Sequence, residues 1–221
     1  MTTLKMLFVD LDGTLADSIP LLYHFYQTFL ARYGKEGNVD EFQRLNGPTI
    51  PEVVRILKQI YALQEPAEQL LQTYEQILLD GYAKETPLAP YAKETLLNLR
   101  RQGVNLGLVT AAKKTLADAF LKSHGMDDWF AFVCAGDHLI KGKPDPEIYE
   151  KAVLLAGCEK PHICVIEDSE NGVKAALAAD LAVIQIDLRQ QKPQIAGNWK
   201  EIYQRLKRYD ELSDYSAEHT F

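Results

Sequence analysis

Near its start the chain reads Leu7-Phe8-Val9-Asp10-Leu11-Asp12-Gly13-Thr14-Leu15. The apolar residues from Leu4 to Val9 predict a buried strand, and that strand ends on Asp10 and Asp12. Two carboxylates one residue apart repel each other at neutral pH unless a cation or a proton lies between them. Gly13 would let the backbone come close to a bound group. The stretch therefore predicts a metal-dependent site with a carboxylate nucleophile.

The composition is typical of a soluble globular protein. The 221 residues are 47% hydrophobic and 25% charged, which fits one large domain or one domain carrying an insertion. The net charge of -7 disfavours nucleic acid and anionic membrane surfaces as partners, and no apolar run is long enough to predict a transmembrane helix. Nothing at the start resembles a signal peptide. The three cysteines are odd in number and widely spaced, so we expect reduced thiols and a cytoplasmic location.

The region between Ala16 and Glu85 shows helical periodicity and contains no strand candidate. We expect a first helix that Asp17-Ser18 caps, with Pro20 in its first turn, and that Gly34 ends. The other predictions for this region are helices at about 40–45, 50–61 and 65–84 and a turn at 46–49. The pattern predicts an all-helical insertion, residues 16–86, between the two parts of a second domain, residues 1–15 and 87–221.

From Pro90 onward, short apolar runs alternate with helical segments. The predicted strands are 104–109, 130–135, 162–166 and 182–186. The predicted helices are 92–101, 115–123, 145–156 with Pro146 in its first turn, and 171–179. Strands separated by helices imply right-handed crossovers and a parallel sheet covered on both faces. We therefore predict an α/β fold with a doubly wound parallel sheet and an inserted helical domain.

Polar residues follow several of these predicted strands. Asp10 and Asp12 end the first strand, Thr110 follows the next, and Glu167-Asp168 follows a later one, while Lys143 lies in a loop before a helix. Ligands of an open parallel sheet bind beyond the carboxyl ends of its strands. Four carboxylates there would suit magnesium, which prefers oxygen ligands. A lysine and a hydroxyl beside them could bind the oxygens of a transferring phosphoryl group.

Four motifs carry a resemblance to a known family. In order, Asp10-Leu-Asp12-Gly-Thr-Leu, Thr110, Lys143-Pro-Asp-Pro and Glu167-Asp168-Ser resemble the four signature motifs of the haloacid dehalogenase superfamily. The match covers essentially the whole chain, and the insertion resembles the helical cap of phosphoglycolate phosphatases and beta-phosphoglucomutases. The resemblance implies a Rossmann-like core, a Mg2+ cofactor and a small phosphorylated metabolite as the partner, in a monomer or weak homodimer.

The resemblance also implies roles for the acidic residues. Asp10 would be the nucleophile that forms an aspartyl-phosphate, and Asp12 would be the general acid and then the general base. Asp10, Asp168 and the main-chain carbonyl of Asp12 would bind the magnesium ion. Glu167 would be a supporting ligand.

Further residues are expected around the phosphoryl group. The resemblance implies that Thr110 binds a phosphoryl oxygen and that Lys143 offsets the negative charge of the nucleophile and the phosphoryl group. The expected substrate-binding residues are Gly13, Thr14, Ala111 and Lys113. Two of these residues could instead have purely structural roles. Thr110 could cap the following helix, and Lys113 could be a solvent-exposed lysine.

The branch of the superfamily is indicated by a few positions. Asp12 speaks against the dehalogenases, which have a single acid in the first motif. Beta-phosphoglucomutases carry a histidine twelve residues after the nucleophile, where this chain has Leu22, with His24 two positions further on. The mutases' cap arginine is also missing after Gly47, although the stretch from Thr110 to Lys114 is mutase-like. We therefore predict a phosphatase, with a phosphomutase and a catalytically silent binding protein as the alternatives.

Overall fold

The computed structural model describes residues 3–45 and 50–209. The chain divides into two compact units, Met1–Asp17 with Pro87–Phe221 and Ser18–Thr86. Within the described residues, no helix combines the length and the apolar character that a membrane span requires.

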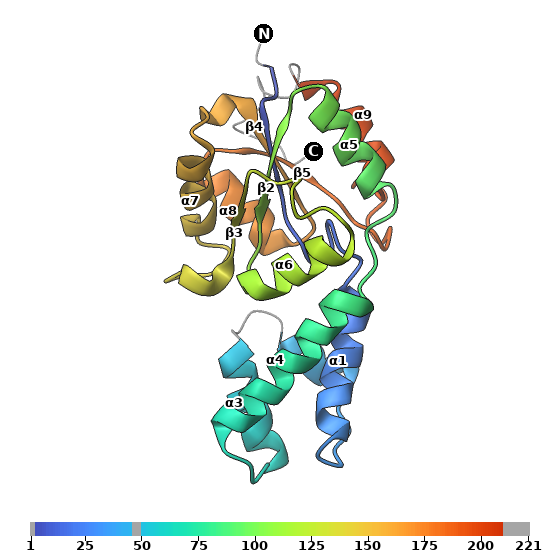
Figure 1. The fold of residues 1–221 in the computed structure, drawn as a ribbon, viewed down its shortest axis with the longest axis vertical. Coiled ribbons are helices and arrows are strands. Elements are labelled where there is room, and N and C mark those ends of the chain that lie inside the picture. The colour runs from blue at the N-terminus through green and yellow to red at the C-terminus, as the bar shows by residue number, and fades with distance from the viewer. Residues whose placement is uncertain (1–2, 46–49, 210–221) are drawn as a thin grey trace. The chain divides into compact units, whose positions relative to one another are not determined.

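The first unit is built on a parallel sheet of five strands (Figure 1). The strands are β1 (Met6–Val9), β2 (Asn105–Val109), β3 (Phe132–Cys134), β4 (Ile163–Glu167) and β5 (Ala182–Gln185), in the order β3-β2-β1-β4-β5. β1 is central, and its last residue, Val9, pairs with Leu108 of β2 and Ile166 of β4. The doubly wound α/β fold predicted from the sequence is confirmed.

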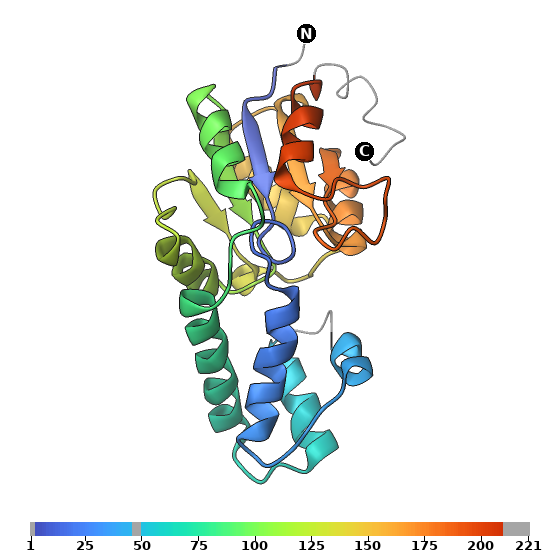
Figure 2. The same ribbon diagram turned by 90° about the vertical axis from the view of Figure 1, so that its right-hand side faces the viewer.

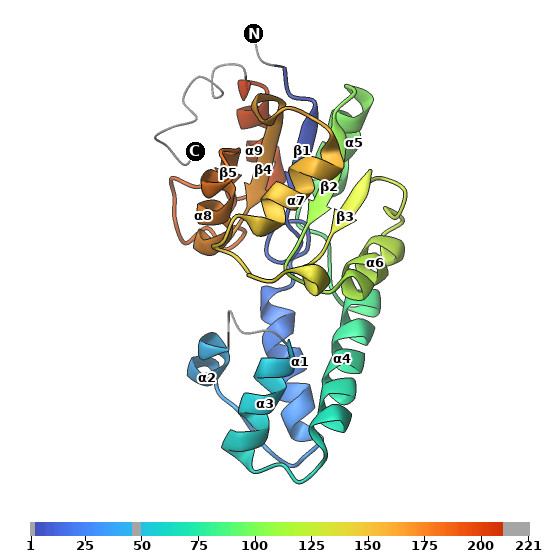
Figure 3. The ribbon, with the colours of Figure 1, turned by 90° about the vertical axis from the view of Figure 1, so that its left-hand side faces the viewer.

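Helices cover both faces of this sheet. The helices of this unit are α5 (Ala92–Arg101), α6 (Lys114–Ser123), α7 (Glu147–Ala156), α8 (Glu170–Ala178) and α9 (Trp199–Leu206), with short 3-10 helices η1 (Gly136–His138) and η2 (Lys160–His162). Figure 2 looks onto α5 and α9, and Figure 3 looks onto α7 and α8 on the opposite face. α9 is an element that the sequence analysis did not predict.

The side chains of β1 and β4 alternate between the two faces, as in any pleated strand. Met6 and Phe8 of β1 lie in one buried cluster with Ile163 and Val165 of β4 and with apolar residues of α7 and α8. The next residues of the same parity are Asp10 and Glu167. The alternation therefore turns both carboxylates toward the face that α7 and α8 cover.

The second unit consists, in its described part, of α1 (Ile19–Ala31), α2 (Val39–Arg44), α3 (Ile50–Tyr61) and α4 (Ala67–Lys84). The rings of Phe29 in α1 and Tyr74 in α4 meet edge to face, with their centroids 5.0 Å apart. The turn predicted at 46–49 lies outside the described residues.

Three predicted helix ends are wrong in detail. Ser18 is the N-cap of α1 and Pro20 lies in its first turn, as predicted, but the Ser18 side chain makes no capping hydrogen bond. Asp17 forms an ion pair with Arg189. α1 ends at Ala31, before Gly34, whose positive φ of 65° continues the turn that follows the helix. Pro146 immediately precedes α7 as its N-cap and is not in its first turn.

Candidate active site

The loop after β1 brings the backbone against the end of β4. The Asp10 amide donates to the Ile166 carbonyl at 3.0 Å, which extends the β1–β4 ladder by one bond. Gly13 has a φ of 75°, and a Cβ atom at this position would overlap the Asp168 carboxylate. Only glycine combines this backbone conformation with this approach. Gly13, which the sequence predicts to lie close to a bound group, therefore packs directly against Asp168 in the loop after β4.

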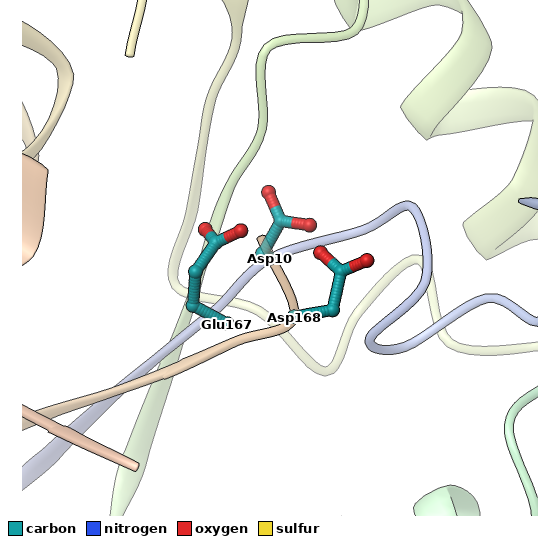
Figure 4. Close-up of side chains that lie close together, drawn as sticks. All are labelled: Asp10, Glu167 and Asp168. Carbon is teal, nitrogen blue, oxygen red and sulfur yellow. The ribbon is translucent and has the colours of Figure 1, made fainter. Parts of the chain in front are cut away.

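Three carboxylates converge where β1 and β4 end (Figure 4). Oxygens of Asp10, Glu167 and Asp168 all lie within 4.8 Å of one another. Asp12 is partly exposed, and its charge is one of those that raise the pKa of Asp168. Oxygen donors at this spacing suit a hard divalent cation such as Mg2+. The donor set therefore fits the cofactor that the sequence predicts.

Lys143 is the cation that the structure places among these acids. Its Nζ atom donates to Asp10 Oδ1 at 2.7 Å and to Glu167 Oε2 at 2.6 Å. The Lys143 and Asp10 side chains are each 8% exposed and that of Glu167 is 1% exposed. Because water is nearly excluded, the attraction between these charges is much stronger than that of a surface ion pair. The buried ion pair joins the predicted nucleophile to the predicted lysine.

The pKa values of the site reflect its excess of negative charge. Burial and the neighbouring Glu167 raise the pKa of Asp10 well above its ordinary value, although Lys143 opposes this. Burial and Glu167 also raise the pKa of Asp168 to about 8. For Glu167 itself, burial is outweighed by Lys143 and by hydrogen bonds, so its pKa is lowered. Lys143 and the other donors outweigh burial at Glu167, whereas burial and the neighbouring carboxylates prevail at Asp10 and Asp168.

Glu167 has further partners that sequence reasoning missed. The hydroxyl of Tyr149, which is buried in α7, donates to Glu167 Oε2 at 2.8 Å. Ser169 donates to Oε1 through its amide at 3.2 Å and its hydroxyl at 2.8 Å, while its Oγ accepts from the Gly172 amide as the N-cap of α8. In the sequence, Tyr149 has the pattern of an ordinary core residue of a helix, so nothing signals its polar contact.

Thr110 lies, buried, at the end of β2 next to β1. Its Oγ1 accepts from the Ala112 amide at 3.0 Å, and it does not cap α6, whose N-cap position is occupied by Lys113. Ala111 is exposed, with its carbonyl against Gly136. The structure thus places the predicted site residues Thr110, Ala111 and Lys113 in the loop after β2.

Thr14 is fully buried, and its hydroxyl has no hydrogen-bond partner among the residues that the structure describes. Its carbonyl accepts from Nε1 of Trp199, at 2.9 Å, although the two residues are 185 positions apart in the chain. Trp199 is fully buried, and its own carbonyl accepts from the Thr95 hydroxyl at 3.2 Å. Trp199 is a second residue that the sequence analysis missed, and it fixes the loop that follows the two acids.

Comparisons with known proteins found related sequences and similar structures. A family model described as haloacid dehalogenase-like hydrolase matches residues 7–186. A phosphoglycolate phosphatase from Nitrosococcus oceani is 32% identical over 86% of this chain and 90% of its own length. A phosphorylated carbohydrates phosphatase from Thermotoga maritima is 26% identical over 80% of this chain and 82% of its own. A solved structure of a haloacid dehalogenase hydrolase of family IA, variant 3, from Entamoeba histolytica has a TM-score of 0.78 at 24% identity and covers 96% of this chain and 100% of that one.

Proposed function

Because the chain belongs to the haloacid dehalogenase-like hydrolase family, we propose that it is a Mg2+-dependent phosphatase that hydrolyses a small phosphate monoester. The observation that carries the proposal is the buried contact of Lys143 Nζ with Asp10 Oδ1, beside the carboxylate of Asp168. A silent binding protein would not need three acids so close together, two of them buried, since their repulsion costs stability. The names of the relatives from Nitrosococcus oceani and Thermotoga maritima also support a phosphate ester as the substrate.

In the first step that we propose, a carboxylate oxygen of Asp10 attacks the phosphorus atom. The bond between phosphorus and the ester oxygen breaks, and Asp12 gives its proton to the departing oxygen. An aspartyl-phosphate is left on Asp10. Lys143 offsets the repulsion between the attacking carboxylate and the anionic phosphoryl group.

In the second step, Asp12 takes a proton from a water molecule as the water attacks the aspartyl-phosphate. The bond between phosphorus and the Asp10 oxygen breaks, which releases inorganic phosphate and regenerates the carboxylate. Asp12 ends the cycle protonated and ready for the next substrate. One residue can serve as acid and then as base because the two steps move a proton in opposite directions.

The ion would be held by Asp10, Asp168 and the main-chain carbonyl of Asp12, with Glu167 in a supporting role. When bound, Mg2+ supplies positive charge that stabilises the phosphoryl oxygens in the transition state. Around the phosphoryl group and the rest of the substrate, the proposed contacts come from Thr110, Gly13, Thr14, Ala111 and Lys113.

We further propose that the helical unit Ser18–Thr86 is the cap that determines which ester is accepted. The three free cysteines fit the expected cytoplasmic location. A monomer or weak homodimer remains the expected assembly.

The test is phosphate release from a panel of phosphorylated metabolites that includes phosphoglycolate and sugar phosphates, with and without Mg2+. We expect release from at least one ester and its near-complete loss in Asp10→Asn. Asp128→Asn, which removes an exposed acid of the same unit, is the matched control and should keep full activity. Hydrolysis by Asp10→Asn at the parent rate would exclude the proposed nucleophile. Conversion of beta-glucose 1-phosphate, with its bisphosphate, to glucose 6-phosphate would identify a mutase instead.

A further inference from the structure

Glu167 is the most enclosed carboxylate of the site. Its Oε2 atom accepts from Lys143 Nζ at 2.6 Å and from the Tyr149 hydroxyl at 2.8 Å. Its Oε1 atom accepts from the Ser169 amide at 3.2 Å and the Ser169 hydroxyl at 2.8 Å. An ionised carboxylate offers about four lone-pair positions. All of them are used by protein donors.

The packing around Glu167 holds this arrangement in place. A Cβ atom at Gly172 would overlap the Glu167 carboxyl carbon, so α8 passes directly against the side chain. With 1% of the side chain exposed, no bulk water is available to replace a donor that is lost. To coordinate a cation, an oxygen of Glu167 would have to give up a buried hydrogen bond, which would leave a buried donor unpaired and is therefore unfavourable. Asp168, next in the chain, is less buried than Glu167.

Tyr149 contacts both members of the Lys143–Glu167 pair. Its hydroxyl donates to Glu167, and the Lys143 Nζ atom lies 5.3 Å from the centroid of its ring. The Tyr149 side chain is fully buried in the core beneath α7. Because the ring is wedged in the core, it limits the positions that the lysine head group and the carboxylate can take.

We propose that Tyr149 and Ser169 hold Glu167 as the fixed acceptor for Lys143, so that Glu167 orients this lysine on Asp10 and stays outside the coordination sphere of the metal ion. Tyr149 is then a positioning residue that acts on the nucleophile through Glu167 and Lys143. The inference rests on the proposed function and assigns Glu167 and Tyr149 a task within it.

The first test is a crystal structure of the parent protein with Mg2+ alone. The expected ligands include Asp10 and Asp168 at about 2.1 Å from the ion, with every Glu167 oxygen beyond about 3.5 Å and still bonded to Lys143 and Tyr149. A Glu167 oxygen at coordination distance would overturn the inference. The result does not depend on which ester is hydrolysed, or on whether any is.

The second test compares Tyr149→Phe with Tyr209→Phe. The control removes another buried tyrosine hydroxyl of the same unit, one that donates to the carbonyls of Pro161 and Ile163. At saturating Mg2+ we expect kcat of Tyr149→Phe to fall about five- to tenfold with KM within about twofold of the parent, because one buried hydrogen bond that orients the lysine is lost. Tyr209→Phe should leave kcat unchanged. Equal kcat values for the two variants would overturn the positioning role, whereas a parent that hydrolyses no ester would refute the proposed function alone.

Discussion

Lys143→Met tests the electrostatics of the site most directly, because methionine keeps most of the side-chain length and removes the charge. The lysine makes two charge-assisted hydrogen bonds, of 2.7 Å to Asp10 and 2.6 Å to Glu167. Hydrogen bonds to charged groups contribute about 1.5–3 kcal/mol each. Removing one partner of a buried ion pair costs about 3–5 kcal/mol, because the charges left behind are uncompensated. The two hydrogen bonds together give about 3–6 kcal/mol, and the loss of an ion-pair partner gives about 3–5 kcal/mol. We therefore expect the free energy of unfolding to fall by about 3–5 kcal/mol near neutral pH.

The loss should depend on pH in a defined direction. Without Lys143, the folded-state pKa values of Asp10 and Glu167 lie above their unfolded values, so the folded protein holds protons that the unfolded chain releases. The penalty therefore grows as the pH rises above the unfolded pKa of about 4, and it shrinks as the pH falls toward that value. In the parent protein, burial is outweighed by Asp10 and Glu167, so the pKa of Lys143 is raised well above its ordinary value and the pair persists at alkaline pH.

Urea unfolding followed by tryptophan fluorescence measures the loss of stability of the α/β unit. Both tryptophans, Trp129 and Trp199, belong to the α/β unit that contains Lys143. The matched control is Lys114→Met, which breaks a surface pair with Asp118 whose side chains are 56% and 50% exposed. Such pairs contribute about 0.5 kcal/mol or less. If Lys143→Met costs no more than this control, or if its cost does not shrink toward pH 5, the argument from buried charge is wrong.

Three further predictions concern Asp168, Gly13 and Cys164, which all belong to the α/β unit. Because the pKa of Asp168 is raised to about 8, the metal-free protein should lose stability as the pH rises from about 4 to about 8. Mg2+ should therefore raise the melting temperature more at about pH 9 than at about pH 6. An equal rise in melting temperature at the two pH values would contradict this prediction. Gly13→Ala should weaken Mg2+ binding and lower kcat by about a hundredfold, because the added Cβ atom displaces the Asp168 carboxylate. The control is Gly34→Ala, at a glycine of positive φ with open space around it, which should cost only about 1 kcal/mol of stability. Cys164 is fully buried with a pKa raised to about 12, so a thiol reagent should label the half-buried Cys158 first; faster labelling of Cys164 would show that the core opens.

The sheet could be predicted because its strands carry strong local signals. Each of the five apolar runs is a strand in the structure, within two residues at either end. α9 carries no comparable signal, since it is short and its first residue, Trp199, is anchored by a hydrogen bond to Thr14 from the other end of the chain. Ser18 had the residue type of a cap without the hydrogen bond, because cap geometry depends on how the preceding chain enters the helix.

The sequence motifs indicated which residues come together at the site, but they did not indicate which hydrogen bonds each residue makes there. Asp10, Lys143, Glu167 and Asp168 all converge. The partners of Glu167 depend on α7, which reaches the site only through a crossover from β3. Tertiary contacts of this kind leave no periodicity in the chain, so Tyr149 could be recognised only in three dimensions.

The parity of β4 explains why its two adjacent acids are not equivalent. Successive side chains of a strand point to opposite faces. Ile163, Val165 and Glu167 share the face that α7 covers, so the Glu167 carboxylate enters a core where only fixed donors can satisfy it. Asp168 is one residue further, beyond the paired strand and against Gly13, where its carboxylate keeps partial exposure. An exchange of glutamate and aspartate between the two positions would change side-chain length and leave parity as it is. The position, more than the residue type, therefore determines which acid accepts hydrogen bonds from the lysine and which stays accessible to the cation that we propose.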